Sequence, residues 1–348
     1  MAESLTKGAH LVGSIPLADT DQVFETLSAH LGKHLRRMPD GETGPRSGWI
    51  GWTAMKLIES PQFAHKYPSY QEISPRTLGL KAGLGTDDLV YPNLEYADHA
   101  LLSYSRFAEL QRRGVIPFDC RFQVSLPTPV AVSSAVFGEA EFRELEPSYE
   151  AVHMREVRRI LDGIPHGRLA VQWDVCLEVW FVDGYLRAPF APVVEGCVDR
   201  LVRYSEAIPP DVELGFHFCY GDYNHEHLKQ PKDISACVRL LNPLAGRLKR
   251  AINWVHMPVP IERTDAGYFQ PLAGLKLPAE TELYLGLIHF RDGVEGARRR
   301  IAAAHSFLPR FGVATECGMG RRQPGRGGDP AELDRLLDLH TMVSSPVR

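Results

Sequence analysis

Residues 212–219 read VELGFHFC, and this stretch is the strongest indication of the fold in the sequence. Residues 212–216 form a short β-rich run of the kind that is buried in a parallel sheet. His217 and Cys219, two residues that commonly bind metals, follow directly where such a strand would end. Other short runs of the same kind lie at residues 9–15, 35–38, 121–125, 169–173, 252–255, 283–287 and 312–314.

Amphipathic stretches with a helical period separate these runs. They cover residues 21–31, 97–113, 149–161, 192–207, 234–241 and 294–307. Strands that are followed by helices indicate parallel pairing through βαβ crossovers, and eight such strands are the number that closes a barrel. The sequence therefore predicts an α/β protein, a (β/α)8 TIM barrel with inserted loops.

A doubly wound open sheet is the competing fold, and a G-x-G-x-x-G turn after the first strand would favour it. The first run instead continues into residues 13–16, GSIP, which lack that motif. We therefore expect one barrel domain over residues 1–348, with an insertion at about 60–95 that is rich in Pro, Gly, Tyr and Ser. Residues 320–329, GRRQPGRGGD, are expected to form a flexible loop before a final helix.

The composition is that of an ordinary globular protein, with 44% hydrophobic and 24% charged residues among 348. Its 39 Lys and Arg against 43 Asp and Glu give a net charge of −4, which argues against a nucleic-acid binder. There is no apolar run of about 18 residues, so no membrane span is expected, and the polar N-terminus does not resemble a signal peptide. Six scattered cysteines indicate reduced thiols in a cytoplasmic enzyme.

Residues that commonly bind metals gather where several predicted strands end. In a TIM barrel the carboxyl ends of the strands converge on one mouth, where active sites lie. His217 and Cys219 point to the same side of an extended segment, and Cys317 follows a strand that faces the same mouth. Two thiolates and one imidazole favour Zn²⁺, and three protein ligands with an open position are typical of catalytic zinc. Alternatively, the cysteines are small buried hydrophobic residues and the histidine is a hydrogen-bonded core residue.

Five short segments resemble the catalytic barrel of cobalamin-independent methionine synthase. Residues 11–16, LVGSIP, are similar to that family's I-G-S-F-P opening, and residues 41–42, GE, are similar to its G-E pair. Residues 172–174, QWD, stand where the family has Q-I-D-E. Residues 215–220, GFHFCY, resemble its H-x-C zinc motif. Residues 314–322, ATECGMGRR, resemble its P-D-C-G-L-K-T-R motif, which carries the second zinc thiolate.

The resemblance implies a methyltransferase that holds zinc through three side chains, those of His217, Cys219 and Cys317. It further implies a set of residues that bind the amino-acid part of a thiol substrate, namely Gly13, Ser14, Glu42 and Asp174. Zinc lowers the pKa of a bound thiol, which leaves a thiolate at neutral pH that can attack an alkyl donor. Acidic side chains nearby suit a substrate ammonium group.

Some features depart from the family pattern. The family's remaining zinc ligand is a glutamate at the end of the next strand, where the aligned residues 253–260, NWVHMPVP, place His256. A neutral imidazole is a competent zinc ligand, so His256 is the fourth candidate ligand, and such a site carries one negative charge fewer. Val175 replaces the glutamate of Q-I-D-E, and the chain is too short for the family's additional N-terminal folate-binding barrel. We therefore expect a different pair of substrates.

Three further residues complete the candidate site. Asp222 is expected to act in catalysis together with Asp174, as a carboxylate that orients a histidine ligand. A turn residue is the equally weighted alternative for Asp222. Arg321 and Arg322 are expected to bind substrate, because a guanidinium can clamp a carboxylate or a phosphate bidentately.

Three classes of function are compatible with these patterns. The first is a zinc-dependent alkyl- or methyltransferase whose partners are a small thiol and an alkyl donor. The second is a metal-independent decarboxylase or carbon–carbon lyase of the uroporphyrinogen decarboxylase type, whose activity would survive a chelator. The third is a barrel that binds a small molecule without turnover. The H-x-C and E-C-G segments favour the first, because the decarboxylase chemistry does not require them.

Overall fold

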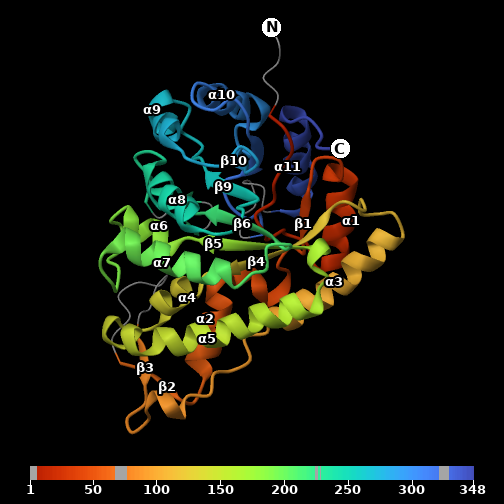
Figure 1. Ribbon diagram of the computed structural model, residues 1–348. Coiled ribbons are helices and arrows are strands. Elements are labelled where there is room, and N and C mark those ends of the chain that lie inside the picture. Colours follow the sequence, from red (N-terminus) through yellow and green to blue (C-terminus); the bar gives the residue numbers. More distant parts are fainter. Residues whose placement is uncertain (1–5, 67–76, 224–225, 228, 321–328) are drawn as a thin grey trace.

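The computed structural model describes residues 6–66, 77–223, 226–227, 229–320 and 329–348 (Figure 1). Within them, seven parallel strands form the main sheet in the order β1-β4-β5-β6-β9-β10-β11. These strands are β1 (Arg37–Pro39), β4 (Arg121–Pro127), β5 (Leu169–Val175), β6 (Glu213–Phe218), β9 (Trp254–Pro258), β10 (Glu282–Ile288) and β11 (Gly312–Thr315). Each overlaps one of the predicted strands, and the α/β class is confirmed.

Helices surround the curled sheet on its outside, as Figure 1 shows. They are α1 (Thr20–Leu31), α2 (Ile50–Glu59), α3 (Tyr96–Arg112), α4 (Pro129–Val136), α5 (Glu139–Gly163), α6 (Leu177–Val182), α7 (Val193–Glu206), α8 (Ser235–Arg247), α9 (Ala266–Phe269), α10 (Gly293–His305) and α11 (Pro330–Val343). Short 3-10 helices lie at Gly44–Gly48, Thr86–Asp88, His166–Arg168 and Gln270–Gly274. All six predicted helices are present. The sequence did not reveal α4 and α6, because every residue of both is buried and neither has an amphipathic period.

The prediction of a regular strand over residues 9–15 is wrong. Ala9 forms isolated bridges to Leu35, just before β1, and to Val313 in β11, so this segment lies between the two edges of the sheet. Ser14 forms one further bridge, to Gly41 after β1, and side chains bond the backbone between these bridges. The carbonyl of Val12 accepts hydrogen bonds from the side-chain amides of Gln123 and Gln172, at 3.1 and 2.7 Å. The sheet is thus consistent with a TIM-like barrel, although no regular eighth strand closes it in the described part of the chain.

A small antiparallel pair lies in the region of the predicted insertion. It consists of β2 (Phe63–His65) and β3 (Leu78–Leu80), which come between α2 and α3 in the chain. Figure 1 shows the pair below α5, away from the main sheet. Leu78 also bridges to Phe137, which follows α4. The division into one domain with an insertion stays a prediction.

The register between neighbouring strands decides which side chains lie next to each other inside the curled sheet. Gln172 in β5 is opposite Gly215 in β6, which is opposite Trp254 in β9. Gly215 has no side chain, and the Trp254 ring fills that space, since a Cβ on Gly215 would lie 2.0 Å from it. Two residues further along, Asp174 and His217 are opposite each other. The ends of β5 and β6 therefore carry two polar side chains on the same face.

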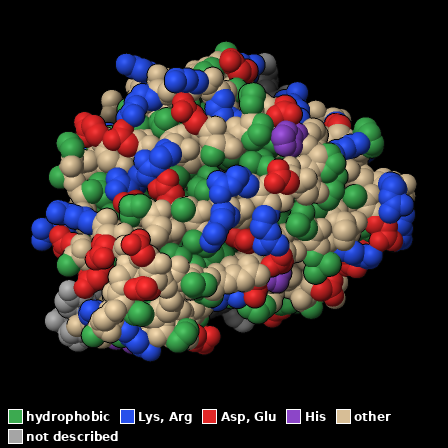
Figure 2. Space-filling view, turned by 60° about the horizontal axis from the view of Figure 1, so that its bottom comes forward, with side chains coloured by type: hydrophobic (Ala, Val, Ile, Leu, Met, Phe, Trp, Pro, Cys, Tyr) green, Lys and Arg blue, Asp and Glu red, His purple; other side chains and the backbone are tan. Residues whose placement is uncertain are grey.

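Charged side chains are mixed on the molecular surface. On the face shown in Figure 2, Lys and Arg side chains lie among Asp and Glu side chains over the described part of the chain. Among the described residues, no helix combines the length and the apolar content that crossing a membrane requires.

Candidate metal centre

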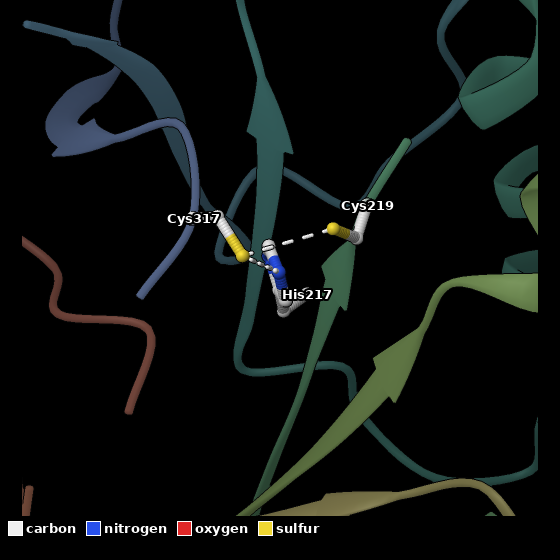
Figure 3. Close-up of side chains that lie close together, drawn as sticks. All are labelled: His217, Cys219 and Cys317. Atoms are coloured by element: carbon white, nitrogen blue, oxygen red, sulfur yellow. Dashed lines mark hydrogen bonds between the residues drawn. The ribbon is translucent and has the colours of Figure 1, made fainter. Parts of the chain in front are cut away.

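His217, Cys219 and Cys317 meet at the carboxyl ends of the strands, with ligand atoms that all lie within 4.8 Å of one another. The two sulfur atoms are 3.8 Å apart, and the sulfur of Cys317 lies 3.7 Å from Nε2 of His217. Figure 3 shows the side chains pointing toward one another, two of them from the end of β6 and the third from the segment after β11. All three are buried. The structure thus brings together residues that are 98 positions apart in sequence.

Local hydrogen bonds hold both cysteine segments. The amide of Gly221 donates to the sulfur of Cys219 at 3.3 Å, an interaction that favours a thiolate. Gly221 has a φ of +75°, and a Cβ there would lie 2.0 Å from the ring of Trp180, so only glycine fits. On the other side, the hydroxyl of Thr315 donates to the carbonyl of Cys317 at 2.7 Å and fixes the turn that follows β11.

The donor set fits a zinc ion. Zinc–sulfur bonds are about 2.3 Å and zinc–nitrogen bonds about 2.0 Å, so two sulfurs on one tetrahedral ion lie about 3.8 Å apart. A sulfur and a nitrogen on the same ion lie about 3.5 Å apart. Two of the three observed separations, 3.8 and 3.7 Å, are close to these values, and the third is within 4.8 Å. Two thiolates and one imidazole also form a soft set, which disfavours Mg²⁺ and Ca²⁺.

His256 lies beside this group but is not one of its three members. Its Nδ1 is 2.7 Å from Nδ1 of His217, and its Nε2 is 3.0 Å from the carbonyl oxygen of Thr315. Burial lowers the pKa of His256 to about 3, so the ring is neutral at pH 7. Both ring nitrogens therefore have partners in the described structure. Whether His256 also binds a metal stays a prediction.

The residues expected to bind the amino-acid part of a substrate also lie together. The carboxylate of Glu42 approaches Gly13 so closely that a Cβ on Gly13 would lie 2.2 Å from Oε1. The carbonyl of Ser14 accepts hydrogen bonds from the amides of Met319 and Gly320, at 2.7 and 3.1 Å. The segment around Ser14 is thereby tied to the turn that carries Cys317. Their role in binding substrate stays a prediction.

Asp174 lies at the end of β5, with its side chain buried. The amide of Gln172 donates to Oδ1 of Asp174 at 2.9 Å. Oε1 of the same Gln172 lies 2.8 Å from Nε2 of His10, which donates because an amide oxygen only accepts. Gln172 thus fixes the carboxylate of Asp174 on the level of His217, its register partner in β6.

Other predicted site residues are placed less fully. Arg321 and Arg322 lie outside the described residues. Asp222 lies in β7 (Asp222–Tyr223), which pairs with β8 (Glu226–His227) in an antiparallel ladder shortly after Cys219. Its part in catalysis stays a prediction.

The sequence analysis missed His289, a buried residue directly after β10. Nε2 of His289 donates to the carbonyl of Val259 at 2.8 Å, and Nδ1 lies 3.7 Å from Oε1 of Glu316. His289 follows the predicted strand 283–287, so the rule that polar residues at strand ends face the mouth could have found it.

A cavity beside β1 and β4 extends the mouth on the other side. Its lining includes Glu42, Arg46, Trp49, Trp52 and Tyr96. Two of these residues, Glu42 and Trp49, have a φ of +48°, a backbone conformation that is rare for residues other than glycine. Such strain is often found at functional sites. This cavity lies on the Glu42 side of the mouth, and the binding of a small molecule there stays a prediction.

Comparison with known proteins supports the fold. No protein-family model matches the chain, and no curated protein sequence matches it. Among solved structures, a protein from Listeria monocytogenes assigned as a vitamin-B12-independent methionine synthase matches with a TM-score of 0.55 and 13% identity. The match covers 97% of this chain and 96% of that chain. At this identity the likeness shows that the two chains share a fold.

Two further solved structures match more loosely. One is a methyltransferase from Methanosarcina mazei, with a TM-score of 0.48, 11% identity and coverage of 97% of this chain and 93% of that chain. The other is the metallated form of a homocysteine methyltransferase from Escherichia coli, with a TM-score of 0.26, 16% identity and coverage of 73% and 90%. These TM-scores are too low for either structure to support a statement about this chain.

Proposed function

We propose that this protein is a zinc-dependent alkyl- or methyltransferase that activates a small thiol. The observation that carries the proposal is the meeting of His217, Cys219 and Cys317 at the strand ends, with separations that suit one zinc ion. Three protein ligands leave a fourth position for a substrate, which is typical of catalytic rather than structural zinc. We also propose a cytoplasmic location, because none of the six cysteines forms a disulfide bond in the described structure.

A bound zinc ion would lower the pKa of a coordinated thiol and so supply a thiolate at neutral pH. In the proposed reaction the thiol loses its proton to solvent, and its sulfur forms a bond to the alkyl carbon of the donor. The bond between that carbon and the donor breaks, and its electron pair leaves with the donor. The two cysteines and His217 would hold the ion, and through it the reacting sulfur.

The acidic side chains at the mouth define the kind of thiol that we expect. Glu42 and Asp174 are both positioned by contacts in the described structure, Glu42 against Gly13 and Asp174 by the amide of Gln172. Two carboxylates favour a cationic group, so the proposed acceptor is an aminothiol. Ser14 lies between this side of the mouth and the turn that carries Cys317.

Metal analysis of the purified protein and its cysteine variants tests the proposal. We expect about one zinc ion per chain, and at least a tenfold loss of bound zinc in Cys219→Ala and in Cys317→Ala, since each removes a ligand. Cys197→Ala is the matched control, because Cys197 is fully buried on α7 and belongs to no candidate site. A folded protein that contains no zinc and binds none when it is supplied would contradict the proposal. Decarboxylation of an acidic substrate in the presence of a chelator would favour the lyase alternative.

A further inference from the structure

The rings of His217 and His256 are joined by a direct hydrogen bond between their Nδ1 atoms, at 2.7 Å. The two residues are register partners on the neighbouring strands β6 and β9, so the sheet itself brings the rings together. Their centroids lie 4.8 Å apart, and both rings are buried. The second ring nitrogen of His256, Nε2, lies 3.0 Å from the carbonyl oxygen of Thr315 at the end of β11.

The positions of the protons in this chain follow from the chemistry of its last acceptor. A carbonyl oxygen only accepts hydrogen bonds, so Nε2 of His256 carries a proton and donates to Thr315. A neutral imidazole has one N–H, so Nδ1 of His256 is an acceptor. The proton of the ring-to-ring hydrogen bond must then belong to Nδ1 of His217. Nε2 of His217 is left with its lone pair, and this atom lies 3.7 Å from the sulfur of Cys317.

We infer that His256 is a positioning residue: it holds His217 as the Nδ1–H tautomer with Nε2 toward the two cysteines, and it does not itself bind the metal. As far as the metal is concerned, the inference rests on the proposed function. Histidine ligands of metals usually donate their second N–H to a carboxylate or a backbone carbonyl, which fixes the tautomer and the ring orientation. Here Nδ1 of His256 accepts the N–H of His217 in place of a carboxylate or a backbone carbonyl. The N–H of His256 in turn donates to the carbonyl of Thr315.

The same short segment supports both sides of the site. Thr315 accepts from His256 through its carbonyl and, through its hydroxyl, donates to the carbonyl of Cys317. A displacement of Thr315 would therefore disturb His217 and Cys317 together. If His256 turned its Nδ1 to a metal instead, the N–H of His217 would lose its buried acceptor, which is unfavourable.

Long-range proton–nitrogen NMR spectra of the full chain with labelled histidines test the tautomers directly. In the metal-free protein we expect His217 to be protonated at Nδ1 and His256 at Nε2. Added zinc should shift only Nε2 of His217 and leave both protons in place. A proton on Nε2 of His217 in the metal-free protein, or zinc bound through Nδ1 of His256, would overturn the inference. If no zinc binds although the two tautomers are as stated, the proposed function fails while the ring-to-ring orientation stands.

Variants of His256 give a second readout, the affinity for zinc. His256→Phe removes the acceptor and should weaken zinc binding 10- to 100-fold. His256→Gln keeps an oxygen that accepts from His217 and an amide that donates to Thr315, so it should stay within about threefold of the wild type. His153→Phe is the matched control, because His153 is fully buried on α5. Equal losses of zinc affinity in the Phe and Gln variants would indicate that His256 is a ligand. An unchanged zinc affinity in the Phe variant would show that His256 only fills space.

Discussion

At the scale of single residues, Glu178 on α6 is a carboxyl group outside the candidate site whose charge matters for stability. Its side chain is fully buried and accepts a hydrogen bond of 2.6 Å from the hydroxyl of Thr128. Burial raises the pKa of Glu178 from 4.5 to about 7, because the apolar surroundings disfavour the charged form. The folded state therefore binds a proton that the unfolded chain has released at pH 5 to 7.

This pKa predicts a pH dependence of stability with a definite sign. The folded pKa lies above the unfolded one, so the contribution is fully present below about pH 4.5 and is lost as the pH rises through about 7. Glu178→Gln should remove this loss and raise the free energy of unfolding at pH 8 by about 3 kcal/mol relative to wild type, with little difference at pH 4.5. Denaturant unfolding at both pH values measures it. Glu25→Gln on the exposed face of α1 should change neither value, and a Glu178→Gln variant less stable than wild type at pH 8 would contradict the prediction.

At the scale of elements, the segment between β1 and β11 is held by isolated backbone bridges and, in addition, by side-chain hydrogen bonds. Gln172 donates to the carbonyl of Val12 and to Asp174, and its Oε1 accepts from His10. Gln172→Leu keeps the approximate volume but leaves these buried groups without their partner, each at a cost of about 1–3 kcal/mol. We expect a loss of at least 2 kcal/mol in the free energy of unfolding, measured with urea. A loss below about 0.5 kcal/mol would show that the segment does not depend on this amide.

The elements also show what could be predicted from the sequence. Strands such as β5 and β6 were found because short apolar runs end in polar residues, and helices such as α10 because one face is apolar. Residues 9–15 have the same pattern as a strand. In the structure they form only isolated bridges, and the carbonyl of Val12 is bonded by the side chains of Gln123 and Gln172, which lie more than 100 residues further on. Local patterns contain no information about such distant partners.

Only part of the candidate site could be predicted from the sequence. The grouping of His217, Cys219 and Cys317 followed from the rule that parallel strands end at one mouth. The position of His256 against His217 depends on the register between β6 and β9 and on the carbonyl of Thr315, which a sequence motif does not specify. A motif can therefore identify candidate ligands, but the hydrogen bonds that orient them require the structure.

At the scale of the whole molecule, the site joins β6 to the segment after β11, which are 98 residues apart. A metal bound only by the folded state stabilises it by mass action, by about 4 kcal/mol at a free zinc concentration a thousandfold above Kd. We therefore expect the Tm to fall by several degrees when a chelator removes zinc, and to recover when zinc is restored. Calorimetry measures both changes. Cys219→Ala lacks one of the proposed zinc ligands. An equally large change in its Tm on removal of zinc would contradict the proposal that Cys219 binds the ion.

X-ray absorption at the zinc edge, with and without added thiol, tests the central claim most directly. Without thiol we predict two sulfur neighbours at about 2.3 Å and at least one nitrogen at about 2.0 Å. An aminothiol such as L-homocysteine should add a third sulfur, and 2-mercaptoethanol, which has no ammonium group for Glu42 and Asp174, should do so only at higher concentration. A zinc shell without two sulfurs, or one that no thiol alters, would contradict the account.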